Sequence, residues 1–462
     1  MKYLAKAWHG FLAVLKTLRL ALPKIGVGWM FALLTIDFNR IAIVELGITA
    51  ILITGLLSVH YFLSPFQVIF GRYADRHPIF GLRRTPYLML SGVVTSAIFV
   101  MLPRLVHQMA GGSVLAYLTA FLAFVLFGVA IAMMGDSHHA LIVETTESKW
   151  RGAVISVVQI VTIMSTIMAA VVMNIVRPIY TPEAMQTLYN LTPMIVIGTI
   201  LLGTIGLERR LKGQALTDAM RKAQEASPDG SALSAAYHTL QRNRQARNFF
   251  FFIFIAIFAI FLQDNILEVF GAEVFGMTVE QTTRFQPTWG GGVLLGMLAM
   301  GLLSMVLPVT KKTITLIGVV GTAVGMATLA VAALVGEVSL VHPALFGMGV
   351  FTGFFNVGAL SMMMDMTVEG ATGLFMGMWG IAQAFGNAFA SLGSGALHTF
   401  LIESGLAAPS TAYFAIFGIE AVGMLVAGLI MTHISVTRFQ QIQERRLTPQ
   451  ELSRTMEAGL AA

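Results

Sequence analysis

The sequence predicts an all-α membrane protein with twelve transmembrane helices, arranged as two pseudo-repeated halves of six helices each. Three observations support this prediction. Hydrophobic residues make up 56% of the 462 residues and charged residues only 11%, which is far from the composition of a soluble domain. Apolar runs of roughly 20 residues, the length that crosses a bilayer, recur along the chain. The basic residues between these runs lie almost entirely on one side of the membrane.

The apolar runs can be placed in order along the chain. Most contain Gly or Pro, which membrane helices tolerate. The expected spans are residues 25–46, 49–70, 86–108, 114–135, 152–176, 191–207, 248–270, 285–307, 313–335, 341–364, 373–399 and 411–432.

Polar segments divide the chain into five parts. Residues 1–23 form either an amphipathic helix lying on the membrane surface or a plain basic leader. Residues 24–207 and 248–432 are the two six-helix halves. The linker 208–247 joins them and contains the turn sequence Ser227-Pro228-Asp229-Gly230. The tail 433–462 contains a helix start with a capping box at Thr448-Pro449-Gln450-Glu451.

The distribution of Lys and Arg predicts the orientation. With both termini in the cytoplasm, the cytoplasmic segments hold all but four of the 29 basic residues, namely all except Arg40, Arg104, Arg177 and Arg284. Cytoplasmic loops of membrane proteins carry this excess. The formal net charge of +6 therefore reports orientation, and we expect no nucleic-acid partner.

The two halves carry matching residues at a constant offset of 221 positions. Parallel half-repeats of six helices of this kind build transporter folds. The matching pairs are Gly128 with Gly349, Glu144 with Asp365, and Gly152 with Gly373.

The first helix carries the densest polar set, consisting of Asp37, Asn39, Arg40 and Glu45. Ionisable residues at membrane depth are costly and mark functional sites by default. Asp37 and Arg40 are three residues apart on one helical face, so we expect them to be able to neutralise each other. The set is either a polar patch that faces a cavity or partner, or a paired structural set near the helix end.

The seventh helix repeats this arrangement with Asp264 and Glu268, next to Gln263 and Asn265. A functional and a structural role remain equally open for these residues. Two polar sets in matching places of the two halves fit a site near the pseudo-symmetry axis.

Three histidines are candidate ligands or proton carriers. His60 lies in the middle of the second helix, whereas His138 and His139 lie at the end of the fourth. One imidazole can bind the magnesium of a tetrapyrrole or carry a proton. The alternative for each is a histidine hydrogen-bonded to a neighbouring helix. Adjacent histidines do not share a helical face, and the chain has no cysteine, so we expect no metal site.

Motifs of catalysis are absent from the sequence. It contains no P-loop, no G-x-S-x-G, no H-E-x-x-H and no dinucleotide-binding fingerprint. We therefore expect neither an enzyme nor an ATP-driven transporter, and no catalytic cofactor. Gln159 and Glu420 are further polar residues in predicted helices.

The loop from Gly71 to Thr85, with the spacing G-x-x-x-D-R-x-x-x-x-x-x-R-R, resembles the loop between helices 2 and 3 of the major facilitator superfamily. Gly allows two helices to approach closely, and the arginines hold the loop in the cytoplasm. The resemblance implies a fold and gating motif composed of Gly71, Asp75, Arg76, Arg83, Arg84, Glu144, Arg151 and Gly152.

Three segments together resemble the bacteriochlorophyll delivery family, the PucC/LhaA group of phototrophic bacteria. The most specific is N-R-x-x-I-V-E-L-G, from Asn39 to Gly47, which ordinary sugar or drug transporters do not show there. The others are the Gly71–Tyr87 loop and the run Leu141–Thr146 with Arg151-Gly152.

This resemblance implies a non-enzymatic assembly factor for light-harvesting antenna complexes, with bacteriochlorophyll or chlorophyll as cargo. The implied partners are the lipid membrane, antenna polypeptides or the reaction-centre complex, and pigment-synthesis enzymes. The implied location is the inner membrane, cytoplasmic or intracytoplasmic, of a phototrophic bacterium. The alternative is a proton-coupled secondary transporter of a small solute, because acids lie in helices 1 and 7.

Overall fold

The structure is a computed structural model that describes residues 13–64, 73–74, 76–147, 150–225, 239–306, 309–366 and 372–444. The chain forms two compact units. The first contains Met1–Pro228 and Gly276–Pro287, and the second contains Asp229–Phe275 and Thr288–Ala462. The boundary at Pro228 falls within the predicted linker.

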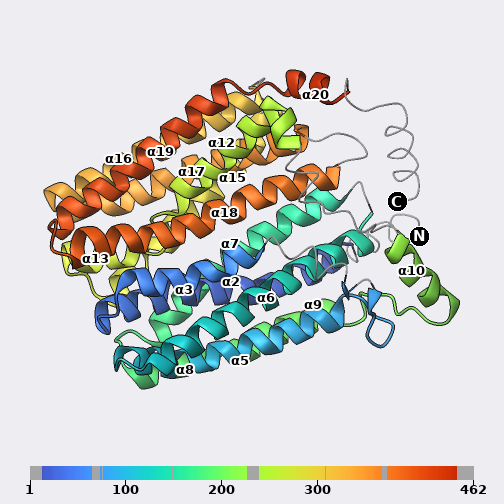
Figure 1. Cartoon of the computed structure of the whole chain (residues 1–462), viewed down its shortest axis with the longest axis horizontal. Helices are drawn as coiled ribbons and strands as arrows, with labels where there is room; N and C mark the ends of the chain where they lie inside the picture. The colour runs from blue at the N-terminus through green and yellow to red at the C-terminus, as the bar shows by residue number, and fades with distance from the viewer. Residues whose placement is uncertain are drawn as a thin grey trace, which may run out of the picture. The chain divides into compact units, whose positions relative to one another are not determined.

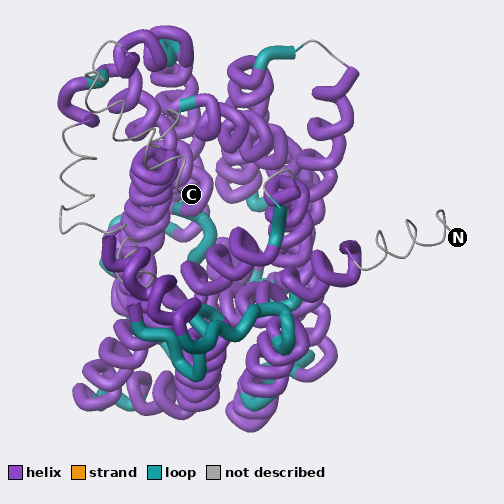
Figure 2. Tube along the Cα trace, turned by 90° about the vertical axis from the view of Figure 1, so that its right-hand side faces the viewer, coloured by secondary structure: helices purple, strands orange, loops and turns teal. Residues whose placement is uncertain are grey.

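The described part of the chain is almost wholly helical and contains no β-strand (Figure 2). Nine of its helical segments are long and apolar enough to cross a membrane, and Ala50–Leu63 is a shorter apolar helix. A helix lies within every one of the twelve predicted spans. The prediction of an all-α membrane protein is confirmed.

Unit 1 is built from helices that pack in neighbouring pairs (Figure 1). The first helix, α2, packs against α7 and α9, while α3 packs against α6, and α5 packs against α6, α8 and α9. The bounds are α2 (Pro23–Ala32), η1 (Leu33–Phe38), η2 (Ile41–Glu45), α3 (Ala50–Leu63), α5 (Thr85–Ala110), α6 (Val114–Thr145), α7 (Arg151–Val176), α8 (Pro182–Tyr189), α9 (Thr192–Thr204), α10 (Gln214–Glu225) and α14 (Val279–Thr282).

Proline and capping residues explain where several of these helices begin. Pro occupies the first turn of α2, α5, α8 and α9, where its missing N–H costs nothing. Ser113 caps α6 by accepting a hydrogen bond from the Ala116 amide. Helix α6 runs ten residues beyond the predicted span 114–135, so His138 and His139 lie within the helix and not at its end.

The segment before α2 is helical from Ala13 and joins α2 through a single turn at Leu22. Its two basic side chains reach the ends of other helices of unit 1. Lys16 donates to the Thr145 carbonyl at the end of α6, and Arg19 donates to the Leu202 and Ile205 carbonyls at the end of α9. Cations favour helix C-termini, where carbonyls lack partners. Residues 1–12 of the predicted surface helix lie outside the described residues.

Unit 2 repeats the same arrangement. Helix α16 packs against α17 and α19, and α12 packs against α18 and α19. The bounds are α12 (Arg244–Phe261), α13 (Leu267–Phe275), α15 (Phe285–Val306, in this unit from Thr288), α16 (Lys311–Val335), η5 (Val338–Leu340), α17 (Val341–Asp365), α18 (Thr372–His398), η6 (Thr399–Glu403), α19 (Pro409–Thr432) and α20 (Val436–Glu444).

Two glycines at the offset of 221 positions mark equivalent helix crossings in the two units. A Cβ atom on Gly128 of α6 would lie 2.9 Å from the Cα of His60 in α3. A Cβ atom on Gly349 of α17 would lie 2.2 Å from the carbonyl oxygen of Trp289 in α15. Small residues allow such close approach of membrane helices.

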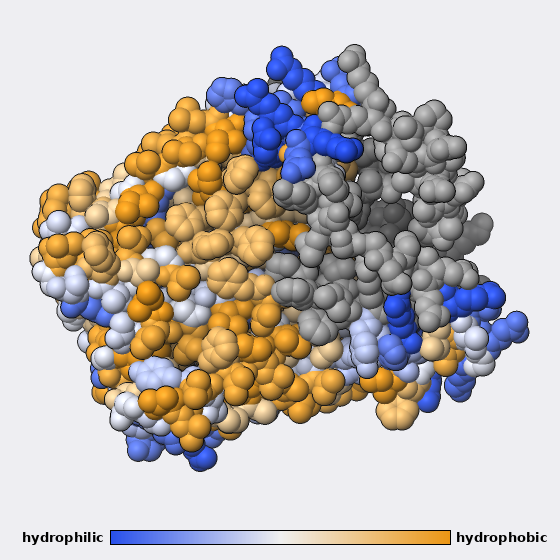
Figure 3. Space-filling view, in the orientation of Figure 1, coloured by the Kyte–Doolittle hydropathy of each residue, from blue (hydrophilic) through white to orange (hydrophobic). Residues whose placement is uncertain are grey.

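The outer surface of the helices is apolar. Figure 3 shows hydrophobic side chains along the lengths of the helices and hydrophilic ones gathered near the helix ends. Exposed Leu118, Leu122, Val324 and Leu429 belong to this surface. An apolar exterior of this kind faces lipid.

The polar segments contain helices that the sequence pattern did not predict. Helix α10 lies in the predicted linker, and α20 lies at the start of the predicted tail. The turn Ser227–Gly230 and the helix start at Thr448 lie outside the described residues.

Candidate functional site

The first helix of unit 1 departs from α-helical geometry where its polar residues lie. Residues Leu33–Phe38 and Ile41–Glu45 form π-helix, and Gly47 follows with a φ of 64°. Such π segments occur frequently at functional sites. The Asn39–Gly47 sequence run therefore coincides with the irregular part of this helix.

A buried ion pair lies at the centre of this irregular segment. Asp37 is fully buried, and Arg177, in the connection after α7, is 1% exposed. One Arg177 guanidinium nitrogen donates to a carboxylate oxygen of Asp37. The expectation that Arg40 would neutralise Asp37 is wrong, because Arg177 takes that place from 140 residues away. The sequence placed Arg177 in a loop and gave it no partner.

Arg40 forms a second ion pair beside the first. Its Nη1 lies 2.6 Å from a carboxylate oxygen of Glu45, and its Nη2 donates to the Met277 carbonyl at 3.2 Å. Met277 belongs to the short stretch of chain that packs with unit 1. Asn39 is fully buried next to this pair. Two polar residues of the specific sequence run, Arg40 and Glu45, are thus held together.

Two tyrosines support the ion pairs from neighbouring segments. Tyr189 of α8 donates to the Leu33 carbonyl at 3.2 Å, at the start of the π segment. The hydroxyl of Tyr180 lies 2.9 Å from Nε2 of His107 in α5. Burial raises the pKa of the Tyr180 phenol, and the carboxyls of Glu45 and Asp37 raise it further. The phenol therefore stays protonated near neutral pH and donates to His107.

The buried pairs keep spare hydrogen-bonding capacity. One carboxylate oxygen of Asp37 and two guanidinium nitrogens of Arg177 have no hydrogen-bond partner among the described residues. Buried polar groups are normally satisfied, and unsatisfied ones call for an explanation. This constellation can bind the polar group of a ligand or partner, or a water molecule.

His60 lies in a separate aromatic cluster of unit 1. Its ring centroid is 5.3 Å from that of Phe31, 5.5 Å from that of Phe127 and 3.8 Å from that of Tyr61. The side chain is buried, and neither ring nitrogen has a hydrogen-bond partner within the described ranges. The structure therefore does not contain the hydrogen bond to a neighbouring helix that the sequence left as the alternative.

His138 and His139 point in different directions, as adjacent residues of a helix must. His138 is buried and donates from Nε2 to the Leu20 carbonyl at 2.7 Å, while His139 is exposed. His138 therefore joins α6 to the helix that precedes α2. No group of three or more His, Asp or Glu suited to a metal ion occurs in the part of the chain that the structure describes.

The first helix of unit 2 is also interrupted where its polar residues lie. Helix α12 ends at Phe261, and residues 262–266 form a turn before α13 begins. In this turn Asn265 donates to Ser391 at 2.7 Å, and Gln263 contacts the sulfur of Met348 at 3.5 Å. Asp264 is half-buried, and Glu268 is fully buried in α13. Both units thus carry polar residues on a first helix that loses regular α-helical geometry.

Unit 2 contains two ionisable features that sequence reasoning missed or ranked low. His398 is buried, and its Nε2 lies 2.9 Å from a carboxylate oxygen of Glu273, which also accepts a hydrogen bond from Tyr413 at 2.9 Å. Glu403 lies 3.5 Å from the other nitrogen of His398. These residues are scattered over more than 100 positions, so no local pattern points to them. Glu420 is fully buried, and neither carboxylate oxygen is hydrogen-bonded within the described chain.

The loop motif is held by carboxylates from two distant segments, the end of α6 and the connection after α9. Arg84 donates twice to one oxygen of Glu144, at 3.0 and 2.8 Å, and Arg83 lies 3.3 Å from the same oxygen. Glu208 accepts the backbone amides of Arg83, Arg84 and Thr85 and so caps the start of α5. Sequence reasoning missed Glu208, because it lies 123 residues from the helix that it caps.

Other members of the motif are less completely described. Arg76 is half-buried. Gly71 and Asp75 lie outside the described residues. Arg151 and Gly152 begin α7, and the side chain of Arg151 is not described.

Unit 2 contains an ion pair in the equivalent place. Lys311, at the start of α16, lies 2.8 Å from both carboxylate oxygens of Asp365, at the end of α17. Asp365 is the residue 221 positions after Glu144. An ion pair between the start of one helix and the end of another thus occurs in both units, as Arg84–Glu144 and as Lys311–Asp365.

Comparison with known proteins relates nearly the whole chain to one family. The family model described as PUCC protein matches residues 37–439. The bacteriochlorophyll synthase 44.5 kDa chain of Rhodobacter capsulatus is 30% identical over 440 residues, covering 92% of this chain and 96% of that protein. Protein PucC of Cereibacter sphaeroides is 25% identical, covering 90% and 91%.

Solved structures with the same fold are transporters. The major facilitator superfamily proton:xylose symporter XylE is 14% identical with a TM-score of 0.62, covering 92% of this chain and 96% of that one. A bacterial homologue of the human lysosomal transporter Spinster is 13% identical with a TM-score of 0.68, covering 94% and 98%. At this level of identity the similarity shows the fold alone, and the major facilitator fold predicted from the loop motif is confirmed.

Proposed function

Because this chain belongs to the PUCC protein family and has the major facilitator fold, we propose that it is a membrane assembly factor for photosynthetic light-harvesting complexes. In this role it binds or delivers bacteriochlorophyll or chlorophyll, the antenna polypeptides, or both. It acts without catalysis, in the inner membrane of a phototrophic bacterium and with both termini in the cytoplasm. The names of its relatives, a bacteriochlorophyll synthase chain and PucC proteins, support this proposal.

One observation carries the proposal furthest. Asn39, Arg40 and Glu45, which belong to the sequence run that resembles the family, lie in or beside the two π segments of helix 1. Sequence specificity and local irregularity thus coincide in the same part of this helix. A segment of this kind is suited to hold the polar parts of a pigment or an antenna helix.

His60 is the proposed axial ligand for a magnesium tetrapyrrole. Neutral imidazole nitrogen is a common metal ligand, and both nitrogens of His60 lack hydrogen-bond partners in the described structure. The rings of Phe31, Tyr61 and Phe127 present apolar faces that suit a flat macrocycle. These rings pack closely around His60, so loading pigment requires them to move apart.

The experiment is purification of the tagged protein from a phototrophic host that makes pigment and antenna polypeptides. We expect bound pigment in the absorption spectrum, antenna polypeptides by mass spectrometry, or both. A protein that carries neither would overturn the assembly proposal. In the same host, deletion of the gene is expected to lower the antenna content of the membranes.

Paired variants test the ligand assignment separately. His60→Phe is expected to remove or shift the absorption of bound pigment, because it removes the nitrogen and keeps an aromatic ring. His139→Phe is the matched control, since His139 is exposed on α6. Equal pigment content in both variants would assign the ligand to another residue and leave the assembly role standing.

The second candidate function is proton-coupled transport of a small solute. The fold shared with a proton:xylose symporter and the buried carboxyls of Asp37 and Glu420 favour it. In proteoliposomes, a pH gradient would then drive solute uptake, and Asp37→Asn would abolish it. Absence of accumulation under any gradient counts against this candidate.

A further inference from the structure

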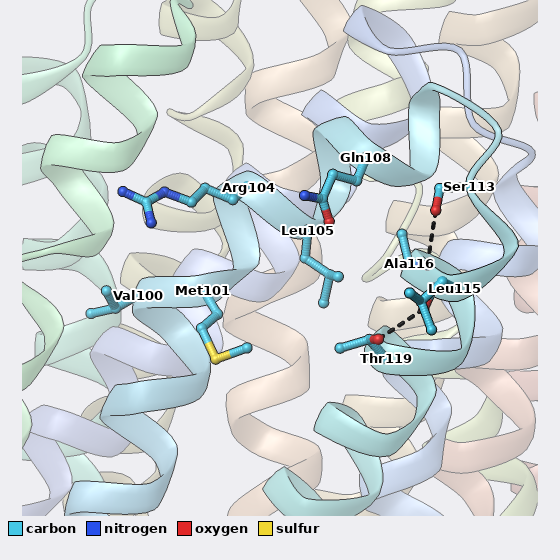
Figure 4. Close-up of a pocket in the computed structure, with 9 residues that line it drawn as sticks. All are labelled: Val100, Met101, Arg104, Leu105, Gln108, Ser113, Leu115, Ala116 and Thr119. Atoms are coloured by element: carbon cyan, nitrogen blue, oxygen red, sulfur yellow. Dashed lines mark hydrogen bonds between the residues drawn. The ribbon is translucent and has the colours of Figure 1, made fainter.

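A groove opens on the outward surface of unit 1, between the end of α5 and the start of α6. It encloses about 580 Å³ and is lined by the nine residues labelled in Figure 4. A second hollow of about 340 Å³ adjoins it towards α8 and shares Arg104 and Gln108 with it. Both hollows thus lie along the last turns of α5.

The walls of the groove are apolar and face outwards. Met101 is 50% exposed and Leu115 is 72% exposed. Leu105 lies between them, where α5 and α6 face each other (Figure 4). Because these helices belong to the apolar exterior that faces lipid, the natural contents of such a wall are hydrocarbon chains.

The rim of the groove carries a positive charge without a partner. Arg104 and Gln108 project from successive turns of α5, and Arg104 points away from α6 (Figure 4). Arg104 is exposed and makes no hydrogen bond or ion pair with any residue that the structure describes. It lies six residues before the end of α5, or roughly 9 Å along the axis at 1.5 Å per residue.

The start of α6 adds a second favourable element for an anion. Ser113, Leu115 and Ala116 line the groove at the N-terminal end of a helix of 32 residues. The first amides of a helix lack intrahelical partners, and the helix dipole favours negative charge there. Arg104 and the first turn of α6 thus both line one groove.

The nearest imidazole is unsuited to ligate a pigment in this groove. Both ring nitrogens of His107 are engaged, one by the Pro103 carbonyl and the other by the Tyr180 hydroxyl. The groove therefore differs in chemistry from the His60 cluster. It matches a molecule with an anionic head and long apolar chains.

We propose that this groove is a binding site for one anionic phospholipid. The phosphate lies against the guanidinium of Arg104 and the amide of Gln108, since Arg binds phosphate through paired hydrogen bonds. The acyl chains lie along Met101, Leu105 and Leu115. This site is independent of the proposed assembly function.

The test uses the fact that the chain has no cysteine. A single cysteine at Leu115 carries a fluorescent label, and the protein is placed in vesicles that contain brominated phosphatidylglycerol or brominated phosphatidylcholine. A contribution of ~1 kcal/mol from one basic residue near an anionic headgroup corresponds to about a five-fold preference for phosphatidylglycerol. A label at Leu118, which is exposed on the same helix but does not line the groove, is expected to show no preference.

Arg104→Gln is expected to abolish the preference measured at Leu115. Arg284→Gln is the matched control, because Arg284 is exposed and paired with Glu280, and it is expected to keep the preference. Equal quenching by the two lipids at Leu115, or a preference that survives Arg104→Gln, overturns the proposal. The brominated lipid could also be displaced by inorganic phosphate as effectively as by unlabelled phosphatidylglycerol. That result would indicate a simple anion site and would overturn the proposal as well.

Discussion

At the scale of single residues, the central feature is a charge pair buried in unit 1. Asp37 and Arg177 lie 140 positions apart in the chain and are both almost completely inaccessible. Breaking a buried pair costs more than the pair contributes, because the remaining charge stays buried without compensation. Removing one partner therefore lowers the free energy of unfolding by more than an ordinary surface substitution does.

Arg177→Gln is expected to lower the free energy of unfolding by about 3–5 kcal/mol. Arg284→Gln is the matched control: it breaks the pair with Glu280, in which Arg284 is 62% exposed, and is expected to change stability by less than about 1 kcal/mol. Thermal unfolding of the purified protein in detergent measures both variants.

The double variant Asp37→Asn with Arg177→Gln completes this test. It is expected to recover part of the lost stability, since no buried charge is left unpaired. If its loss in the free energy of unfolding equalled the sum of the losses in the two single variants, the two residues would not act as a pair.

The same pair shows what the sequence could and could not predict at this scale. The sequence identified Asp37, Asn39, Arg40 and Glu45 as one polar set, because charged residues stand out in an apolar run. It paired Asp37 with the wrong arginine, because helical spacing reveals only local neighbours. Arg177 becomes a partner through tertiary packing, which no local pattern encodes.

At the scale of helices, the offset of 221 positions repeats contacts as well as residues. Gly128 and Gly349 occupy equivalent helix crossings. Glu144 and Asp365 each form an ion pair with a basic residue at the start of an equivalent helix, Arg84 for α5 and Lys311 for α16. The glycines could be found from the sequence because they are separated by the constant offset of 221 positions. The pairing of Lys311 with Asp365 could not be predicted, since Lys311 does not lie 221 positions after Arg84.

Gly349→Ala is expected to destabilise the protein by about 1–3 kcal/mol, because the added methyl would overlap the Trp289 carbonyl and force the backbones apart. Gly347→Ala on the same helix is the control, since no atom lies within 4 Å of its Cβ position. This control should be neutral or slightly stabilising, as Ala favours helix more than Gly. Thermal unfolding compares the two, and equal stability would contradict the assigned crossing.

The two equivalent ion pairs are expected to differ in strength. Arg84→Gln should cost roughly 1.5–3 kcal/mol, because Arg84 is 6% exposed and donates two hydrogen bonds to a charged carboxylate. Lys311→Gln should cost at most about 1 kcal/mol, because Lys311 is 50% exposed. Both are measured by thermal unfolding, and a larger loss for Lys311→Gln would contradict the ranking.

At the scale of the whole molecule, composition and charge distribution were enough to predict the fold class. Twelve apolar runs, a basic bias and a half-repeat together describe a major facilitator fold, and the solved structures agree. The fold does not identify the cargo, because one fold can serve several different functions. In the sequence, the run from Asn39 to Gly47 is the most specific of the three segments that resemble the bacteriochlorophyll delivery family.

The orientation predicted from the basic residues can be tested on a chain without cysteine. Glu337→Cys, in the exposed connection between α16 and α17, is expected to react with a membrane-impermeant maleimide added to right-side-out vesicles. Thr217→Cys, exposed on α10, is expected to react only after the membrane is opened. The reverse pattern would place both termini on the other side.

The π segments of the first helix have a mechanical consequence. Backbone hydrogen bonds in a π segment span one residue more than those of an α turn. The helix therefore accommodates an extra residue at Leu33–Phe38 and again at Ile41–Glu45. When such a bulge passes along a helix by one position, the residue that it leaves behind rotates by about 100° while the number of hydrogen bonds stays the same. Asn39 and Arg40 lie between the two π segments. A shift of either segment would therefore rotate their side chains about the helix axis, without a hinge and without unfolding a turn.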